Sequence, residues 1–262
     1  MGIVVEREER HEGGHWLRVT IDNREKLNSL NRTLMAELVT GMAAGAADAS
    51  LRLVVLTGAG ERAFVGGADI AEIAALDRAG ATEFITLVHR CCDAFRHLPV
   101  PVIARIDGWA LGAGLELAAA CDLRVASERS QFGMPEVRIG IPSVVEAALL
   151  PQLIGHGRAR RLLLTGEPIG AAEALDWGLV DVVVPPERLD AEVARLTAAI
   201  LAGGAGAIRL QKSLILDWEE LPTGEAVRRG IAVFAAAFDS DEPRRMAGAA
   251  LAALRGRRKA RQ

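Results

Sequence analysis

Two glutamates stand where an acidic side chain is unusual, and they are the residues of this sequence best able to do chemistry. Glu116 lies in residues 114–120 (GLELAAA), a helical run that is apolar on every side and is therefore expected to be buried. Glu136 lies in a loop, and a short predicted strand, residues 123–126, could bring both glutamates to one edge of a sheet. Two carboxylates beside one pocket can divide the roles of general acid and general base. Two plainer interpretations stay open: Glu116 would bond the amides of its own first helical turn, and Glu136 would be solvated.

Two glycine-rich turns, each between a predicted strand and a predicted helix, could supply backbone N–H donors. They are residues 63–70 (AFVGGADI) and residues 107–116 (DGWALGAGLE). Glycine lets the backbone approach a ligand closely, and the amides of Ala68 and Ala113 would lie at helix starts, where negative charge is favoured. Two such donors aimed at one carbonyl oxygen form an oxyanion hole. Neither turn has a P-loop or G-x-G-x-x-G pattern, so no dinucleotide site is predicted.

Alternating strands and helices must position these residues. Strands are predicted at residues 3–6, 16–21, 51–57, 102–106, 123–126 and 180–184. Helices are predicted at residues 31–47 (with Asn31 as the N-cap), 68–76, 82–97, 112–121, 144–153, 158–164 and 171–177. This alternation is typical of a layered α/β fold.

We expect three segments along the chain. An α/β core spans residues 1–186 and carries the candidate site, and an Ala-rich helical region spans residues 187–254. The basic tail, residues 255–262 (RGRRKARQ), is expected to be a solvated, frayed end, with a contact to substrate phosphates as the alternative.

The composition excludes several classes of protein. The chain has 262 residues, 50% hydrophobic and 25% charged, which is typical of a globular protein with a buried core. A net charge of −3 argues against a general nucleic-acid binder, and the absence of tyrosine excludes a tyrosine acid or base. The first ten residues are charged where a signal peptide is apolar. The longest charge-free stretch, residues 196–208, is shorter than the ~20 apolar residues of a membrane span. We therefore expect a cytoplasmic protein that does not enter a membrane.

The cysteines and histidines show no metal-ligand spacing, so no metal is expected. Cys91, Cys92 and Cys121 are predicted to be small buried residues. Their odd number fits a reducing compartment.

Seven ordered segments resemble the crotonase, or enoyl-CoA hydratase/isomerase, superfamily. They are residues 26–30 (KLNSL), 63–70 (AFVGGADI), 107–118 (DGWALGAGLELA), 121–126 (CDLRVA), 131–136 (QFGMPE), 164–167 (LTGE) and 174–180 (ALDWGLV). They follow the family order and spacing, whereas the helical C-terminal part resembles the family more weakly.

The resemblance implies a spiral of ββα units followed by a helical region that builds trimers or dimers of trimers. It implies an acyl-CoA substrate whose thioester carbonyl meets the amides of Ala68 and Ala113. Coenzyme A would be part of the substrate, with no separate cofactor. The implied substrate-binding and CoA-binding residues are Lys26, Ala63, Phe64, Val65, Gly67, Asp69, Ile70, Gly112, Pro142 and Ser143.

The hydratase branch of this family carries two glutamates at the positions of Glu116 and Glu136. The resemblance therefore implies addition of water across an α,β-unsaturated thioester to give a 3-hydroxyacyl-CoA. Glu116 would act as the base while the water oxygen attacks Cβ, and Glu136 would supply a proton to Cα.

The sequence departs from the family after the second glutamate. Hydratases usually continue into Ile-Pro-Gly-Ala-Gly-Gly, whereas residues 141–146 here are IPSVVE. Ser143 replaces a glycine, Val144 and Val145 are expected to narrow the pocket, and Glu146 adds another acid.

Three alternatives to a hydratase stay open. An enoyl-CoA double-bond isomerase can work with one carboxylate near the position of Glu136. A hydrolase that acts on 3-hydroxyacyl thioesters is the second alternative. A non-catalytic CoA-binding or RNA-binding relative has only the basic tail and the arginines of residues 158–161 in its favour.

Overall fold

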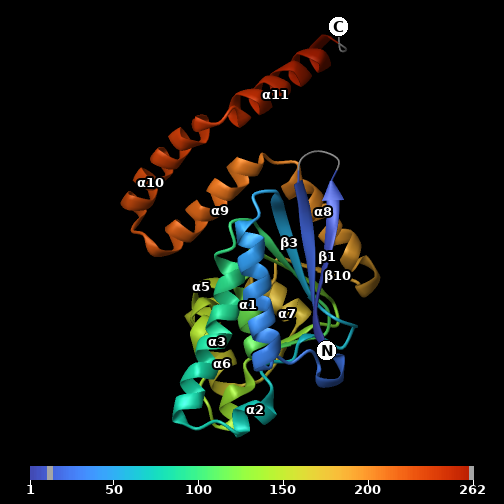
Figure 1. Ribbon diagram of the computed structural model, residues 1–262, viewed down its shortest axis with the longest axis vertical. Helices are drawn as coiled ribbons and strands as arrows, with labels where there is room; N and C mark the ends of the chain where they lie inside the picture. The colour runs from blue at the N-terminus through green and yellow to red at the C-terminus, as the bar shows by residue number, and fades with distance from the viewer. Residues whose placement is uncertain (11–13, 260–262) are drawn as a thin grey trace. The chain divides into compact units, whose positions relative to one another are not determined.

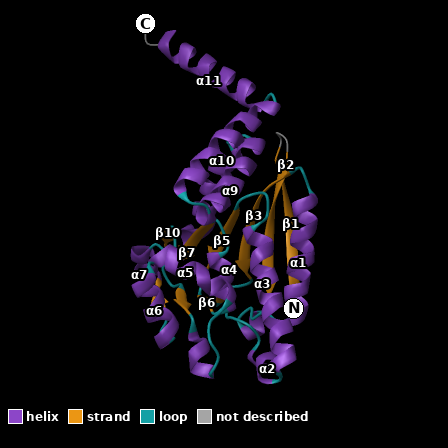
Figure 2. Cartoon of the chain, turned by 90° about the vertical axis from the view of Figure 1, so that its left-hand side faces the viewer, coloured by secondary structure: helices purple, strands orange, loops and turns teal. Residues whose placement is uncertain are grey.

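The strands of the structure, a computed structural model, form two sheets (Figures 1 and 2). The structure describes residues 1–10 and 14–259. The larger sheet has the strand order β1 (Gly2–Arg10), β2 (Gly14–Asp22), β3 (Leu51–Gly58), β5 (Val102–Ile106), β7 (Leu123–Ser127) and β10 (Val182–Val184). The smaller sheet has the order β4 (Ala63–Val65), β6 (Trp109–Leu111), β8 (Gln131–Gly133) and β9 (Ile169–Gly170). β1 and β2 are antiparallel, and the other neighbours in the larger sheet are parallel.

Helices follow the strands throughout the first 200 residues. They are η1 (Arg24–Lys26), α1 (Arg32–Ala47), α2 (Ile70–Ala74), α3 (Arg78–Arg96), α4 (Ala113–Ala119), η2 (Pro135–Ile139), η3 (Val145–Leu149), α5 (Leu150–Ile154), α6 (His156–Thr165), α7 (Ala171–Trp177), η4 (Pro186–Arg188) and α8 (Leu189–Leu201).

A ββα unit recurs along the chain. After β3, β5 and β7 in turn, the chain adds one short strand to the smaller sheet (β4, β6 and β8) and then a helix. The α/β class and the ββα units expected from the sequence are therefore confirmed.

Side-chain caps explain where the first helices begin. Asn31 is the N-cap of α1, as predicted, and accepts the N–H of Leu34 at 2.9 Å. Asp69 caps α2 by accepting the N–H of Ala71, so that helix begins later than residue 68. Asp77 accepts the N–H of Gly80 at 2.7 Å, so α3 begins at Arg78 rather than at residue 82.

The predictions fail where elements are short or irregular. β4, β6 and β8 have three residues each, which is too few for a strand period to show in the sequence. The helix predicted at residues 144–153 is divided into η3 and α5. Val145 has a positive φ of 42°, which a regular α-helix does not allow.

The core lies between the larger sheet and the helices that cover it, with α1 and α3 packed side by side (Figures 1 and 2). Cys91, Cys92 and Cys121 are 0%, 1% and 4% exposed and have free thiols, which confirms that they are small buried residues. The predicted turn at residues 13–14 lies partly outside the described residues.

The chain divides into two compact units, Met1–Thr197 and Ala198–Gln262, so the division falls inside α8, beyond the expected boundary at residue 186. The second unit holds α9 (Ala205–Glu220), α10 (Thr223–Ala236), η5 (Ala237–Asp239) and α11 (Glu242–Lys259). Glu242 accepts the N–H groups of Gly206 and Ala207 at the start of α9.

The backbone of α11 continues to Lys259 and so includes the first residues of the basic tail, whose solvated, frayed end stays a prediction. The rest of the basic tail, residues 260–262, lies outside the described residues.

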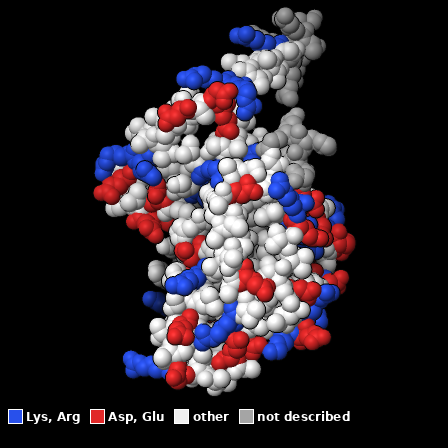
Figure 3. Space-filling view, in the orientation of Figure 1, with Lys and Arg blue, Asp and Glu red and all other residues white. Residues whose placement is uncertain are grey.

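On the face shown in Figure 3, basic and acidic side chains are interspersed. In the part of the chain that the structure describes, no single helix is long and apolar enough to cross a membrane.

Candidate active site

A cavity of about 760 Å³ lies in the first compact unit, between α2, α3, α4 and the segment that follows β8. Its apolar wall includes Ile73, Phe84, Ile85 and Val88. Most of the residues singled out from the sequence line it, namely Gly67, Ala68, Ile70, Gly112, Ala113, Glu116, Glu136, Pro142 and Ser143. An apolar cavity with a few convergent polar groups is typical of a site for a small molecule.

Five expected binding residues do not line this cavity. Ala63, Phe64 and Val65 form β4 and are at most 1% exposed, so their side chains pack in the core. Lys26 lies 2.7 Å from Asp69 (Nζ to Oδ2), and this ion pair joins η1 to the start of α2. The Lys26 ammonium lowers the pKa of Asp69.

Ala68 lines the cavity, and the pairing of its neighbours does not use its amide. Leu30 donates its N–H to the Gly67 oxygen and accepts the N–H of Asp69, both at 2.8 Å. This parallel bridge uses the peptide groups on either side of Ala68 and not its own N–H. Gly67 has a φ of 107°, which side chains rarely allow.

The amide of Ala113 is the first of α4, where N–H groups have no partner within the helix. Gly112 precedes it with a φ of 51° and donates its own N–H to the Gly133 oxygen at 2.9 Å. Gly114 packs so closely on β4 that an added Cβ would collide with the Val65 carbonyl. The two turns therefore meet, and both line the cavity.

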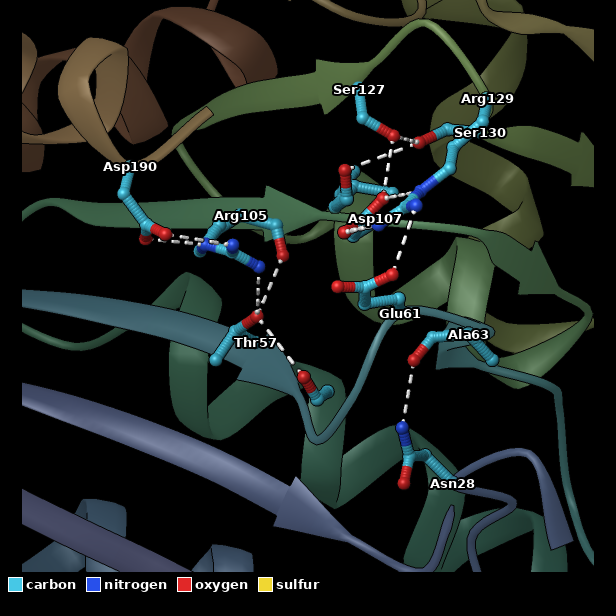
Figure 4. Close-up of polar contacts among 12 residues, drawn as sticks. Asn28, Thr57, Glu61, Ala63, Arg105, Asp107, Ser127, Arg129, Ser130 and Asp190 are labelled. Carbon is cyan, nitrogen blue, oxygen red and sulfur yellow. Dashed lines mark hydrogen bonds and ion pairs between the residues drawn. The ribbon is translucent and has the colours of Figure 1, made fainter. Parts of the chain in front are cut away.

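A polar network fixes the strands that carry these turns (Figure 4). Asp107, at the end of β5, accepts two bonds from Arg129, at 2.6 and 2.7 Å, and one from the Ser127 hydroxyl at 2.7 Å. Asn28 donates to the carbonyl oxygen of Ala63 at 2.7 Å, which joins the segment after η1 to β4. These contacts lie away from the cavity and position its walls.

The two glutamates approach the cavity from different elements. Glu116, in the first turn of α4, is 4% exposed and accepts the N–H of Ala147 at 3.2 Å. Its partner is thus an amide of η3, not one of its own helical turn. Glu136, in η2, accepts the hydroxyl of Ser143 at 2.7 Å, and its Oε1 lies against Gly112, where an added Cβ would collide with it.

Burial and the nearby carboxylate of Glu136 raise the pKa of Glu116 to about 8. Two carboxylates in one pocket cannot both ionise readily, so such a pair retains one proton. Burial makes Glu116 the member of the pair whose neutral form is favoured.

Glu116→Gln is expected to raise the Tm by several degrees at about pH 9 and to change it little at about pH 5. The pKa of Glu116 lies above its usual value of 4.5 when the protein is folded. The stabilisation that the neutral carboxyl contributes is therefore complete below about 4.5 and is lost as the pH rises through about 8. Glutamine is neutral at every pH, so the variant does not lose this stabilisation.

Circular-dichroism melts across this pH range check the difference in Tm, with the surface variant Glu128→Gln as control. A Tm difference that is the same at both pH values would contradict the raised pKa.

Three contacts at this site were not predicted from the sequence: the Ser143 hydroxyl on Glu136, the Ala147 amide on Glu116, and a pair formed by His89 and Glu146. The departure from the family pattern at residues 141–146 was the only signal for them. Val144 lines the cavity as expected, whereas Val145 is outside its lining.

The chain is similar to known proteins of one family. A model of the family "Enoyl-CoA hydratase/isomerase" matches residues 13–253. Crotonyl-CoA hydratase of Syntrophomonas wolfei is 40% identical over 213 residues, which cover 80% of this chain and 80% of that protein. Short-chain-enoyl-CoA hydratase of Clostridium acetobutylicum is 37% identical over 198 residues, covering 75% and 76% of the two chains. The crystal structure of an enoyl-CoA hydratase from Bacillus anthracis superposes with a TM-score of 0.89 at 31% identity, covering 98% of this chain and 97% of that one.

Proposed function

The chain belongs to the enoyl-CoA hydratase/isomerase family, and from this premise we propose that it adds water across the 2,3 double bond of an enoyl-CoA. The observation that carries the proposal is the presence of two carboxyls, Glu116 and Glu136, at one cavity with the amides of Ala68 and Ala113. The product is a 3-hydroxyacyl-CoA. Relatives at 40% and 37% identity are named as hydratases of short enoyl-CoA esters.

The two amides bind the thioester carbonyl oxygen. Addition of water at Cβ places negative charge on this oxygen as an enolate, and the N–H groups of Ala68 and Ala113 stabilise that charge. Removal of one such donor typically costs about 3 kcal/mol of transition-state stabilisation. The apolar wall of the cavity accommodates the acyl chain, and coenzyme A enters as part of the substrate rather than as a separate cofactor.

The two glutamates pass one proton around a closed cycle. The resting protein holds it on Glu116, and a water bound to both carboxyls lets it move to Glu136. Glu116 is then the base that takes a proton from water while the water oxygen bonds to Cβ. Glu136 gives its proton to Cα as the double bond is lost. The cycle ends with the proton back on Glu116, where it began. Ser143 holds Glu136 in place through its hydroxyl.

The test is the loss of the conjugated enoyl-thioester absorbance when the protein is mixed with crotonyl-CoA. Formation of 3-hydroxybutyryl-CoA, identified by mass spectrometry, would support the hydratase. Binding of crotonyl-CoA without loss of absorbance would overturn it. Movement of the double bond in a 3-enoyl-CoA would then support the isomerase, and release of free coenzyme A from a 3-hydroxyacyl-CoA would support the hydrolase.

We also propose that the helical unit, Ala198–Gln262, joins copies of this chain into a trimer or a dimer of trimers. Val227, Ile231 and Phe234 lie at i, i+4 and i+7 on α10 and are 58%, 68% and 71% exposed within one chain. Residues at this spacing form one stripe along a helix. A contiguous exposed apolar stripe is a candidate interface, and a second copy of this chain is the occupant that the family favours.

Ile231→Asp is expected to reduce the assembly to monomers, because it places a charge in the apolar stripe. Light scattering coupled to size exclusion checks this: the unmodified protein should elute well above the monomer mass of 27.8 kDa. Arg228→Glu is the control, since Arg228 is exposed beside the stripe. An unmodified protein that is monomeric at micromolar concentration would contradict the proposed assembly.

The remaining proposals concern the setting of the enzyme. Three free thiols fit a reducing compartment, and we propose the cytoplasm. An enoyl-CoA substrate belongs to the breakdown or synthesis of acyl chains. We expect neither RNA nor a membrane to be a partner, in keeping with the net charge of −3.

A further inference from the structure

A second buried carboxyl, Glu146, lies behind Glu116 and takes no part in the proton cycle above. Its side chain belongs to η3 and is 8% exposed. His89 of α3 contacts it, with 2.7 Å between Nδ1 and the Glu146 Oε1. Its other oxygen, Oε2, is buried without a hydrogen-bond partner among the described residues. A buried carboxyl costs free energy unless it is paired, so one placed beside an active site points to a role there.

The turn that carries Glu146 also holds Glu116. Ala147, the next residue, donates its N–H to the Glu116 Oε1 at 3.2 Å. Val145, the preceding residue, has a φ of 42°, which a β-branched side chain rarely adopts. Such strain persists only where the surrounding contacts fix the backbone. The His89–Glu146 and Glu116–Ala147 contacts do so here, because they fasten this turn to α3 and to α4.

We propose that Glu146, held by His89, is a positioning residue that fixes the place and the protonation state of the Glu116 carboxyl. Glu146 is outside the lining of the cavity, so it acts through Glu116 and not on the substrate. This inference rests on the proposed function, in which Glu116 must begin the cycle with a proton.

The ionisable groups close to Glu116 show how Glu146 can affect its pKa. Glu136 faces it from η2, Glu146 faces it from η3, and Cys92 faces it from α3. Burial raises the pKa of Cys92 well above its usual value and that of neighbouring Cys91 to about 12, so both thiols stay neutral. The charges that act on Glu116, among the described residues, are therefore the carboxylates of Glu136 and Glu146. Both raise the pKa of Glu116.

Glu146→Gln tests the proposal, because it removes the charge and keeps the shape. The readout is the titration of Glu116 in protein labelled with 13C at the glutamate side-chain carboxyls, with Glu116→Gln identifying the signal. The midpoint is expected to fall in Glu146→Gln, because a neighbouring like charge that disfavours ionisation of Glu116 is removed. The alkaline limb of the kcat profile for crotonyl-CoA is expected to move by the same amount. An unchanged or raised midpoint would overturn the proposal, since a merely structural role lowers the Tm without moving this titration.

His89→Ala is the second variant, and it tests the tether. We expect kcat to fall about fivefold with little change in KM, and this fall to disappear when Glu146→Gln is also present. His97→Ala is the matched control, since His97 is the C-cap of the same helix, is similarly exposed and is also paired, with Asp93 at 2.6 Å. Equal effects of His89→Ala with and without Glu146→Gln would overturn the tether.

The titration needs no substrate, so the two proposals can fail separately. Failure of the protein to hydrate crotonyl-CoA would overturn the proposed function. A Glu116 titration midpoint that is the same with and without Glu146→Gln would overturn the positioning role.

Discussion

Glu116→Gln and Glu136→Gln are each expected to lower kcat for hydration of crotonyl-CoA by about 10²- to 10⁴-fold, with the protein still folded. Each change removes one group that transfers a proton. A glutamine at position 116 cannot take a proton from water, and a glutamine at position 136 cannot give a proton to Cα. Both substitutions keep the shape of the side chain, so Ala147 and Ser143 keep hydrogen-bond partners. KM should change little, because the amides that bind the thioester carbonyl are untouched.

The double variant separates this mechanism from a simple sum of losses. Groups that act as one unit are strongly non-additive, so removing both carboxyls should cost hardly more than removing one. Glu128→Gln, on the surface, is the control and should keep full activity. Steady-state rates from the enoyl-thioester absorbance, with circular dichroism to verify folding, check the prediction. Normal turnover in either single variant would exclude a two-carboxyl hydratase.

Gly114→Ala is expected to lower kcat/KM by roughly 10²- to 10³-fold, the effect of losing an oxyanion donor. Gly114 follows Ala113 at the start of α4 and packs directly on β4. An added Cβ would collide with the Val65 carbonyl, so the start of α4 must move away from β4. That movement carries the Ala113 amide away from the Ala68 amide, and the thioester oxygen can then meet only one donor.

Gly157→Ala is the matched control for this change. Gly157 lies in α6, where an added Cβ would meet nothing within 4 Å, so its replacement should leave the rate unchanged. Thermal melts distinguish a misplaced amide from a protein that is unfolded at the assay temperature. If Gly114→Ala is folded and keeps the kcat/KM of the unmodified protein, the Ala113 amide does not act on the substrate.

Several elements of this protein could be predicted from the sequence because they depend on interactions between residues close together in the chain. The N-cap at Asn31, the long buried strand β3 and the helical C-terminal region depend on side chains a few residues apart. The same holds for the two glycine-rich turns, because a positive φ such as that of Gly67 is a property of the residue itself. Glu116 was conspicuous as a carboxyl in an apolar helix, and the order of seven segments added the family.

Only the tertiary structure decided what each of these groups touches. Glu116 meets an amide 31 residues away, and His89 meets Glu146 over 57 residues. The residues of β4, which were expected to bind coenzyme A, have their side chains buried in the core. Such pairings depend on how strands and helices from distant parts of the chain pack together, which leaves no periodic trace in the sequence. The raised pKa of Glu116 follows from the same packing, because burial and a neighbouring carboxyl, not residue type, cause it.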